Sequence, residues 1–175
     1  GDLAAELVEQ VERCPLDTSL LRVTLRSYQL FGAKYILTRQ RALLGDEMGL
    51  GKTVQAIAVM ADLYARGRRQ LLVVCPAGVL VNWCREIPQH SLLPVHREEQ
   101  LLRWQEEGGV GVTTYETLQR LDFSGLPALH LLVADEAHYV KNPQAQRTRA
   151  LMALAERAEG LLFMTGTPLE NRVEE

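Results

Sequence analysis

The segment Gly45-Asp46-Glu47-Met48-Gly49-Leu50-Gly51-Lys52-Thr53 decides the fold of this 175-residue chain. The short apolar run 42–44 precedes it and is typical of a strand. An apolar stripe at helical spacing follows it, formed by Val54, Ile57, Ala58 and Ala61. The sequence therefore predicts a strand, a glycine-rich loop and a helix in this order. In this arrangement, backbone N–H groups and the positive end of a helix bind phosphate.

The rest of the chain repeats this alternation of strands and helices. Further apolar runs predict strands at 71–75, 110–113, 129–134 and 161–164. Helical patterns occupy 3–13, a segment capped by Ser27, 79–87, 115–121 and a stripe from Leu151 to Ala158. The segment 89–109 is the least regular, and we interpret it as a surface excursion. Strands that are apolar throughout and separated by helices predict an α/β fold, with a mostly parallel sheet and helices on both faces.

The glycine-rich loop has the residue types that a nucleotide phosphate requires. Gly49 and Gly51 let the backbone approach an anion closely. Lys52 is placed to reach the β- and γ-phosphates, and the Thr53 hydroxyl to hold Mg²⁺. The strict phosphate-loop pattern has Gly where this chain has Asp46, so the match is to its second half. A turn without a ligand would explain the glycines, but not Lys and Thr in this order.

An acidic segment, Asp135-Glu136-Ala137-His138, follows the apolar run 131–134. Two carboxylates at the end of an apolar strand are costly unless they hold a cation or face a polar ligand. Asp135 is placed to bind Mg²⁺, and Glu136 to orient and deprotonate the attacking water. His138 is then free to sense the γ-phosphate side. Alone, the tetrapeptide would also fit a solvated turn, but together with the phosphate loop it predicts nucleotide hydrolysis.

Composition excludes several classes of protein. A net charge of −3 does not indicate an avid, nonspecific nucleic-acid binder, and an apolar content of 47% supports a hydrophobic core. No apolar stretch reaches the ~20 residues that a membrane helix needs, and the first residues carry no signal-peptide pattern. We therefore expect no membrane partner. Cys14, Cys75 and Cys84 lack metal-like spacing and are expected to be reduced thiols.

Further segments resemble the Swi/Snf-type ATPases of helicase superfamily two. In chain order they are LRSYQLFG at 25–32, DEMGLGKT at 46–53, VCPA at 74–77 with VNW at 81–83, TTYETL at 113–118, DEAH at 135–138 with VKN at 140–142, and TGTPLEN at 165–171. That family also has Asp at the start of the phosphate loop. The stretch between the third and fourth of these motifs is short, and it lacks the Gly expected soon after His96.

The resemblance implies a domain organisation and a set of site residues. It implies a RecA-like P-loop NTPase lobe at 21–175, after an N-terminal helical extension at 1–20, with the second RecA-like lobe absent from this chain. It implies an ATP site that joins Gln29, as the adenine contact near Tyr28, to the loop residues Asp46, Glu47, Met48, Gly49, Leu50, Gly51, Lys52 and Thr53. DNA phosphates would contact Pro76, Ala77, Asn82 and Thr114. Coupling of ATP state to lobe closure would use Thr165, Gly166 and Thr167.

The function that follows is a DNA-dependent ATPase that binds Mg-ATP and moves along duplex DNA. Lys52, Asp135 and Glu136 would be its catalytic residues. The isolated lobe is expected to be nearly inactive, because an arginine finger from the second lobe contributes ~10³–10⁵ in rate. Two alternatives remain open: an RNA helicase or restriction-type motor, and a non-enzymatic nucleotide-dependent interaction module. The expected location is the bacterial cytoplasm, beside the nucleoid, or the nucleus in a eukaryote.

Three prominent side chains outside these motifs, or at their margins, receive structural roles. We expect Trp83 and Trp104 to pack in the core or between lobes rather than stack on bases. Glu98, next to Glu99, is expected to lie on a solvated face.

Overall fold

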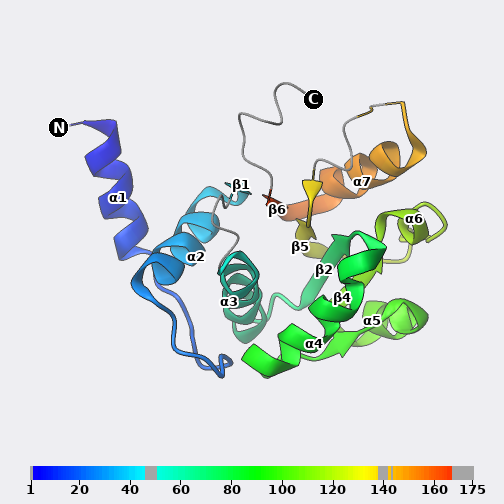
Figure 1. Ribbon diagram of the computed structural model, residues 1–175, viewed down its shortest axis with the longest axis horizontal. Coiled ribbons are helices and arrows are strands. Elements are labelled where there is room, and N and C mark those ends of the chain that lie inside the picture. Colours follow the sequence, from blue (N-terminus) through cyan, green and yellow to red (C-terminus); the bar gives the residue numbers. More distant parts are fainter. Residues whose placement is uncertain (1, 46–50, 138–141, 143, 167–175) are drawn as a thin grey trace.

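A computed structural model of the chain describes residues 2–45, 51–137, 142 and 144–166, the side chains of 43–45 excepted. Figure 1 shows a central sheet with helices on both sides. The six strands are β1 (Arg41–Gly45), β2 (Gln70–Cys75), β3 (Val95–His96), β4 (Gly109–Thr114), β5 (Leu129–Ala134) and β6 (Ala158–Thr165). Their order is β1-β6-β5-β2-β4-β3, and every neighbouring pair is parallel. The predicted α/β fold with a parallel sheet is confirmed.

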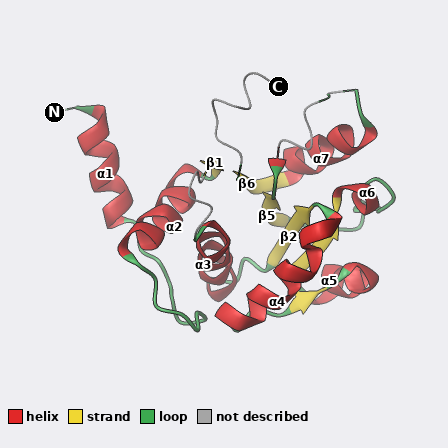
Figure 2. Ribbon diagram, in the orientation of Figure 1, coloured by secondary structure: helices red, strands yellow, loops and turns green. Residues whose placement is uncertain are grey.

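Helices cover both faces of this sheet, as Figure 2 shows. They are α1 (Leu3–Arg13), α2 (Ser27–Arg39), α3 (Lys52–Ala65), α4 (Leu80–His90), α5 (Leu101–Glu107), α6 (Tyr115–Leu118) and α7 (Gln146–Arg157). Side chains of α2, α3 and α4 form one apolar cluster, and those of α5, α6 and α7 form another. These six helices therefore form two layers, one on each face of the sheet, whereas α1 packs against α2.

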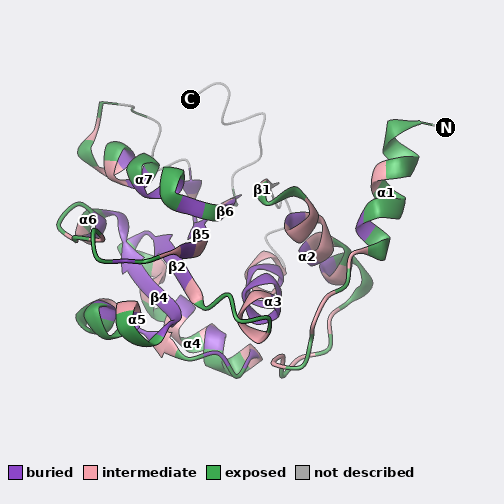
Figure 3. Cartoon of the chain, turned by 180° about the vertical axis from the view of Figure 1, so that it is seen from behind, coloured by how far each residue is buried: buried purple, intermediate pink, exposed green. Residues whose placement is uncertain are grey.

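Strand β2 shows why the strands read as apolar throughout. Leu71 and Val73 pack into the cluster on the α3 face, whereas Leu72 and Val74 pack into the cluster on the α7 face. Successive side chains of a strand point to opposite faces, so a sheet covered on both sides needs apolar residues at every position. Figure 3 shows β2 and α3 as largely buried and α1 as largely exposed.

The structure corrects four predictions of local structure, three at the end of an element and one over a whole segment. Ser27 is the first residue of α2 rather than its cap, because Arg26 holds the cap position and donates its backbone N–H to Gln29 Oε1 at 2.9 Å. Ala158 begins β6 instead of ending the preceding helix. The helix predicted at 115–121 ends at Leu118. The segment 89–109 is not an irregular excursion, since it contains β3, the 3₁₀ helix η2 (Glu98–Gln100) and α5.

Candidate nucleotide site

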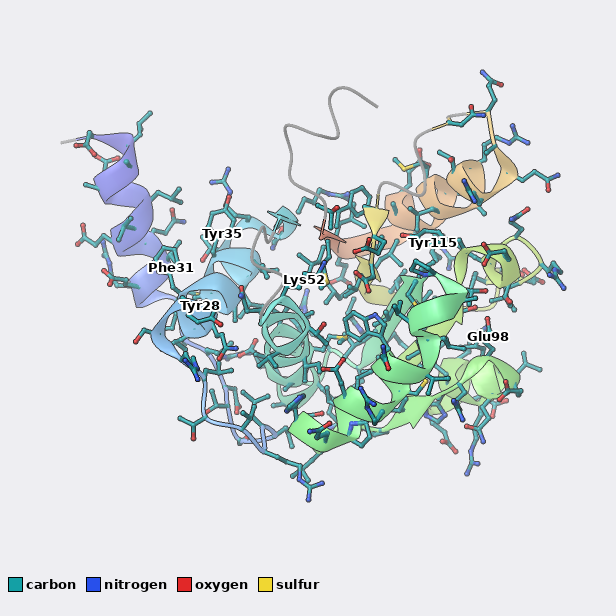
Figure 4. All side chains as sticks on the ribbon, viewed as in Figure 1. Tyr28, Phe31, Tyr35, Lys52, Glu98 and Tyr115 are labelled. Carbon is teal, nitrogen blue, oxygen red and sulfur yellow. The ribbon has the colours of Figure 1, made fainter. Side chains whose placement is uncertain are left out.

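Three adjacent strands bring the nucleotide motifs together. Strand β6 lies between β1 and β5 in the sheet, and all three run in the same direction. Their carboxyl ends therefore meet at one edge, where ligands bind in open parallel sheets. Lys52 begins α3 after the loop that follows β1, Asp135 follows β5, and Thr165 ends β6. Figure 4 shows Lys52 at the start of α3, close to this edge.

Glu136 connects the phosphate-loop lysine to the end of β6. Its Oε1 lies 3.4 Å from Lys52 Nζ and accepts a hydrogen bond of 3.1 Å from the backbone N–H of Gly166. Both charged side chains are mostly withdrawn from solvent, with exposed fractions of 12% for Lys52 and 28% for Glu136. Residues from three separate motifs thus contact one another at this edge of the sheet.

The backbone of Glu136 lies in the left-handed region. Its φ is 53°, which non-glycine residues rarely adopt because the Cβ atom approaches the backbone. Such strain persists where the surrounding structure holds it, and it is common at functional sites. Here this conformation accompanies the contacts of the Glu136 carboxylate with Lys52 and with Gly166.

Asp135 is a buried carboxylate, with an exposed fraction of only 7%. The indole Nε1 of Trp83 donates to its Oδ2 at 2.8 Å, and the backbone N–H of Glu136 donates to its Oδ1 at 2.9 Å. Burial raises the pKa of Asp135, while the Trp83 hydrogen bond and the charge of Lys52 oppose that rise. The carboxylate is therefore fixed in orientation and held at a cost in desolvation free energy.

The backbone of Asp135 is also fixed on both sides. Its N–H donates to the carbonyl of Val74 at 2.8 Å, and its carbonyl accepts from the hydroxyl of Tyr115 at 2.6 Å. Burial raises the pKa of Tyr115, so this phenol stays protonated and remains a donor. Neither Tyr115 nor Trp83 was given a site role from the sequence, although both stand inside segments that carry the family resemblance.

Gly51, the first described residue of the phosphate loop after Gly45, has a conformation that requires glycine. It caps α3 with a φ of 85°, in the left-handed region that glycine adopts freely. A Cβ atom there would lie 2.9 Å from the Tyr28 hydroxyl and 2.9 Å from Gln29 Nε2. The start of α2 thus lies against Gly51, and the predicted adenine residue Gln29, only 8% exposed, lies beside it.

The other predicted nucleotide residues divide into two groups. Thr53 follows Lys52 in α3 and is half-buried. Ala137, which follows the acidic pair Asp135-Glu136, is buried. The remaining ones lie outside the described residues: Asp46, Glu47, Met48, Gly49, Leu50, His138 and Thr167.

The predicted DNA-contact residues lie on one side of the same edge. Pro76 is buried and precedes the 3₁₀ helix η1 (Ala77–Val79), in which Ala77 is exposed. Asn82 is exposed on α4, one residue before the buried Trp83. Thr114 is buried, and its hydroxyl accepts from the backbone N–H of Thr117 at 3.1 Å. The four residues therefore differ in how much surface they offer a partner.

Glu98 is not on a solvated face, so that prediction is wrong. Its Oε1 accepts hydrogen bonds from the Thr113 hydroxyl at 3.1 Å, the Thr114 backbone N–H at 3.1 Å and the Thr114 hydroxyl at 3.2 Å. Glu98 therefore ties η2 to the end of β4, where α6 begins (Figure 4). Nothing in the sequence around Glu98 distinguishes it from its exposed neighbour Glu99.

The described part of the chain has neither a cluster of metal-ligating side chains nor a helix that could cross a membrane. Within it, no three His, Cys, Asp or Glu side chains gather as a metal site. None of the helices described there is both long enough and apolar enough to cross a membrane.

Comparison with known proteins gives one family throughout. The model of the SNF2-related domain matches residues 28–175. The Swr1 helicase of Emericella nidulans is 35% identical over 174 residues, which cover 89% of this chain and 10% of that protein. SWI/SNF-related matrix-associated actin-dependent regulator of chromatin subfamily A-like protein 1 of Bos taurus is 32% identical over 173 residues, covering 96% of this chain and 18% of that protein.

A solved structure shares both fold and sequence. The Sulfolobus solfataricus SWI2/SNF2 ATPase core in complex with double-stranded DNA superimposes with a TM-score of 0.79 at 32% identity, covering 91% of this chain and 35% of that one. The chain is thus similar to one part of these longer proteins. With the parallel sheet, the acidic pair and the phosphate-loop lysine in place, this chain belongs to the SNF2-related family and corresponds to the first RecA-like lobe of the Swi/Snf-type ATPases.

Proposed function

We propose that this chain is the ATP-binding lobe of a DNA-dependent ATPase that hydrolyses Mg-ATP together with a second lobe and moves along duplex DNA. The observation that carries the proposal is the contact of Glu136 with both Lys52 Nζ and the Gly166 N–H at the carboxyl edge of the sheet. A lysine at a helix start, a carboxylate pair and a backbone donor at one edge are the groups that phosphoryl transfer uses.

ATP would lie against the start of α3. Lys52 supplies a positive charge for the β- and γ-phosphates, and the N-terminus of α3 adds its dipole. The adenine would lie near Gln29 and Tyr28, which flank the phosphate loop at Gly51. The remaining residues of the loop, from Asp46 to Leu50, belong to the proposed site on the strength of the family resemblance.

The residues at the site fit a magnesium ion. Thr53 offers a hydroxyl oxygen and Asp135 a buried carboxylate, and hard oxygen donors are the ligands that Mg²⁺ prefers. Because Mg²⁺ keeps several waters and binds substrate phosphates, one or two protein oxygens suffice. When bound, the ion would neutralise charge that develops on the phosphates.

The two carboxylates of the acidic pair, Asp135 and Glu136, have different proposed roles. Asp135, fixed by Trp83 and by the Glu136 backbone, keeps its carboxylate in one orientation. Glu136 is proposed to orient the attacking water and to accept its proton. The contact of Glu136 with the Gly166 N–H gives the end of β6 a means to respond to the state of the nucleotide. Thr165, Gly166 and Thr167 are the proposed coupling segment.

Duplex DNA and a second RecA-like lobe are the proposed partners. Pro76, Ala77, Asn82 and Thr114 are the proposed contacts with DNA phosphates, of which Ala77 and Asn82 are exposed. The chain carries a net charge of −3, so its DNA binding alone should be weak. The proposed location is wherever the cell keeps its DNA: the nucleoid of a bacterium or the nucleus of a eukaryote.

The test is phosphate release from Mg-ATP, with and without linear duplex DNA. It is run on this chain and on a longer native chain that includes the second lobe. We expect activity and DNA stimulation from the longer chain only, because the arginine finger contributes ~10³–10⁵ in rate. Robust DNA-stimulated hydrolysis by the 175 residues alone would contradict the need for a second lobe.

Two controls separate the alternatives. RNA that stimulates the longer chain better than duplex DNA would favour an RNA helicase. Lys52→Ala should abolish hydrolysis, since Lys52 is the proposed phosphate contact. If Lys52→Ala left every activity of the longer protein unchanged, the chain would instead be a non-enzymatic interaction module.

A further inference from the structure

Asp135 receives hydrogen bonds from α4, which carries the proposed DNA contact Asn82, and from α6, which begins directly after the proposed DNA contact Thr114. Trp83 of α4 donates to its carboxylate at 2.8 Å, and Tyr115 of α6 donates to its backbone carbonyl at 2.6 Å. Each donor stands next in sequence to a proposed DNA contact, Asn82 in one case and Thr114 in the other. One residue of the nucleotide site is therefore joined directly to both elements.

The geometry of helix α4 can transmit a displacement from its surface to Asp135. Asn82 is exposed while Trp83, the next residue, is only 2% exposed and reaches the carboxylate of Asp135. Neighbouring residues on a helix point in directions about 100° apart, so one can face solvent while the other faces the core. A partner that moves the start of α4 would therefore move the indole N–H relative to Asp135.

We propose that Trp83 is a positioning residue that sets the orientation of the Asp135 carboxylate and couples DNA contact at α4 to hydrolysis. This inference rests on the proposed function. Trp83 touches neither nucleotide nor DNA in this role. It acts through a hydrogen bond to an ionised acceptor, which is about twice as strong as a neutral one and is directional. Tyr115 supports the same residue from the backbone side.

Trp104 of α5 offers a matched control. It is fully buried, and its indole Nε1 donates a hydrogen bond of 2.9 Å to the backbone carbonyl of Gly109. Substitution by Phe removes one indole N–H and part of one ring at either position. Trp83→Phe and Trp104→Phe should therefore cost similar stability, whereas only Trp83→Phe changes a contact with Asp135.

The kinetic test uses the native enzyme that includes this chain and the second lobe. In Trp83→Phe we expect kcat with saturating duplex DNA to fall about tenfold or more, as for loss of a hydrogen bond to a charged acceptor. The stimulation ratio, kcat with DNA over kcat without, should fall as well. The DNA concentration for half-maximal stimulation should stay near that of the wild type, because Trp83 does not contact DNA.

Trp104→Phe should keep the wild-type stimulation ratio, even if its melting temperature falls as much as that of Trp83→Phe. Equal stimulation ratios in the two variants would overturn the proposal and leave Trp83 a packing residue. A wild-type enzyme without any DNA-stimulated hydrolysis would instead overturn the proposed function itself, and the inference would fall with it.

A spectroscopic test does not depend on turnover. The native two-lobe enzyme is labelled with 5-fluorotryptophan, and the ¹⁹F resonances of Trp83 and Trp104 are assigned as those that disappear in Trp83→Phe and in Trp104→Phe. We expect Mg-ADP, with binding measured by calorimetry, to shift the Trp83 resonance and to leave the Trp104 resonance in place. In Asp135→Ala, at a Mg-ADP concentration that calorimetry shows to saturate the variant, the shift should disappear. If Mg-ADP binds and the Trp83 resonance does not move, the proposal is wrong.

Discussion

Asp135 is buried and Glu98 is half-buried, and the pKa values of the two carboxyl groups shift in opposite directions from their usual values. Burial raises the pKa of Asp135 more than its hydrogen bond from Trp83 and the charge of Lys52 lower it. Burial also raises the pKa of Glu98, but hydrogen bonds from Thr117, Thr114 and Thr113 outweigh it and lower the pKa below its usual value. The difference lies in the number of donors set against the extent of burial.

The comparison separates two uses of the same chemical group. Glu98 joins η2 to the start of α6, so its charge stabilises the folded state. Asp135 lowers stability at neutral pH, because its carboxylate is more easily ionised in the unfolded chain. A buried charge that costs stability is typical of a group retained for function. Substitutions at the two positions should therefore have opposite profiles of activity and stability.

Asp135→Asn should give the largest effect on activity. The amide cannot supply the negative charge proposed to hold Mg²⁺, so DNA-stimulated hydrolysis by the two-lobe enzyme should fall at least about 10²-fold. Stability should change by no more than about 1 kcal/mol, because relief of a buried charge offsets the loss of one of the two hydrogen bonds that the carboxylate accepts, since an amide nitrogen cannot accept. Phosphate release and urea unfolding measure the two quantities. If Asp135→Asn lowered stability but not activity, Asp135 would be a stabilising carboxylate like Glu98.

A pair of glycines at the two ends of α3 sharpens the comparison. Gly51 has a φ of 85° and lies against Tyr28 and Gln29, whereas Gly67 has a φ of 91° with nothing within 4 Å of a Cβ atom. Both Ala substitutions should cost about 1–2 kcal/mol through backbone strain. Only Gly51→Ala should also weaken nucleotide binding, because the new Cβ atom would displace Tyr28 and Gln29 beside the proposed adenine site. The loss of affinity should be about tenfold if the contacts of these two side chains with the nucleotide are worth about 1.4 kcal/mol.

Calorimetric titration with Mg-ADP on both variants measures this difference. Equal losses of affinity in Gly51→Ala and Gly67→Ala would mean that strain in α3, rather than crowding at the phosphate loop, controls nucleotide binding.

Glu98→Gln should lower stability and leave the chemistry intact. We expect a loss of about 1 kcal/mol in the free energy of unfolding, because Glu98 is half-buried and a neutral amide accepts weaker hydrogen bonds. The matched control is Glu99→Gln, at the exposed neighbour. Urea unfolding compares the three proteins. A loss as large in Glu99→Gln would show that net charge, not the contact with Thr113 and Thr114, is responsible.

The smallest expected effect is on pH dependence. The pKa of Glu98 is lower in the folded protein than its usual value of 4.5, so its contribution to stability is fully present above that value. This contribution is lost as the pH falls through the folded pKa. The difference in unfolding free energy between wild type and Glu98→Gln should therefore shrink below about pH 4.5. A difference that is constant from pH 7 to pH 3 would contradict this assignment.

Local patterns predicted most of the sheet and the nucleotide motifs. The strand at 129–134 has the predicted bounds, and α1 does as well. Strand β3 and helix α5 escaped prediction because they have two and seven residues, too few to show a period. The convergence of Lys52 and Glu136 followed from placing both motifs at the ends of parallel strands.

The contacts of Asp135 with Trp83 and Tyr115 could not be predicted from the sequence. Trp83 and Asp135 are separated by 52 residues in sequence, and Tyr115 and Asp135 by 20. Both contacts depend on how α4 and α6 pack against the sheet. The role of Glu98 was missed for the same reason. Its partners Thr113 and Thr114 become neighbours only when η2 lies beside the end of β4.

The strand order also has a consequence for folding. Strand β6, the latest in sequence of the described strands, inserts between β1 and β5, both of which are made earlier. Until it does, β1 has no partner strand, because β6 is its only neighbour in the described sheet. Pairing over such a long sequence separation is slow. During synthesis, the residues of the phosphate loop and of the acidic pair are therefore made before they come together as a site. ATP can stabilise only a chain in which β6 has already inserted between β1 and β5.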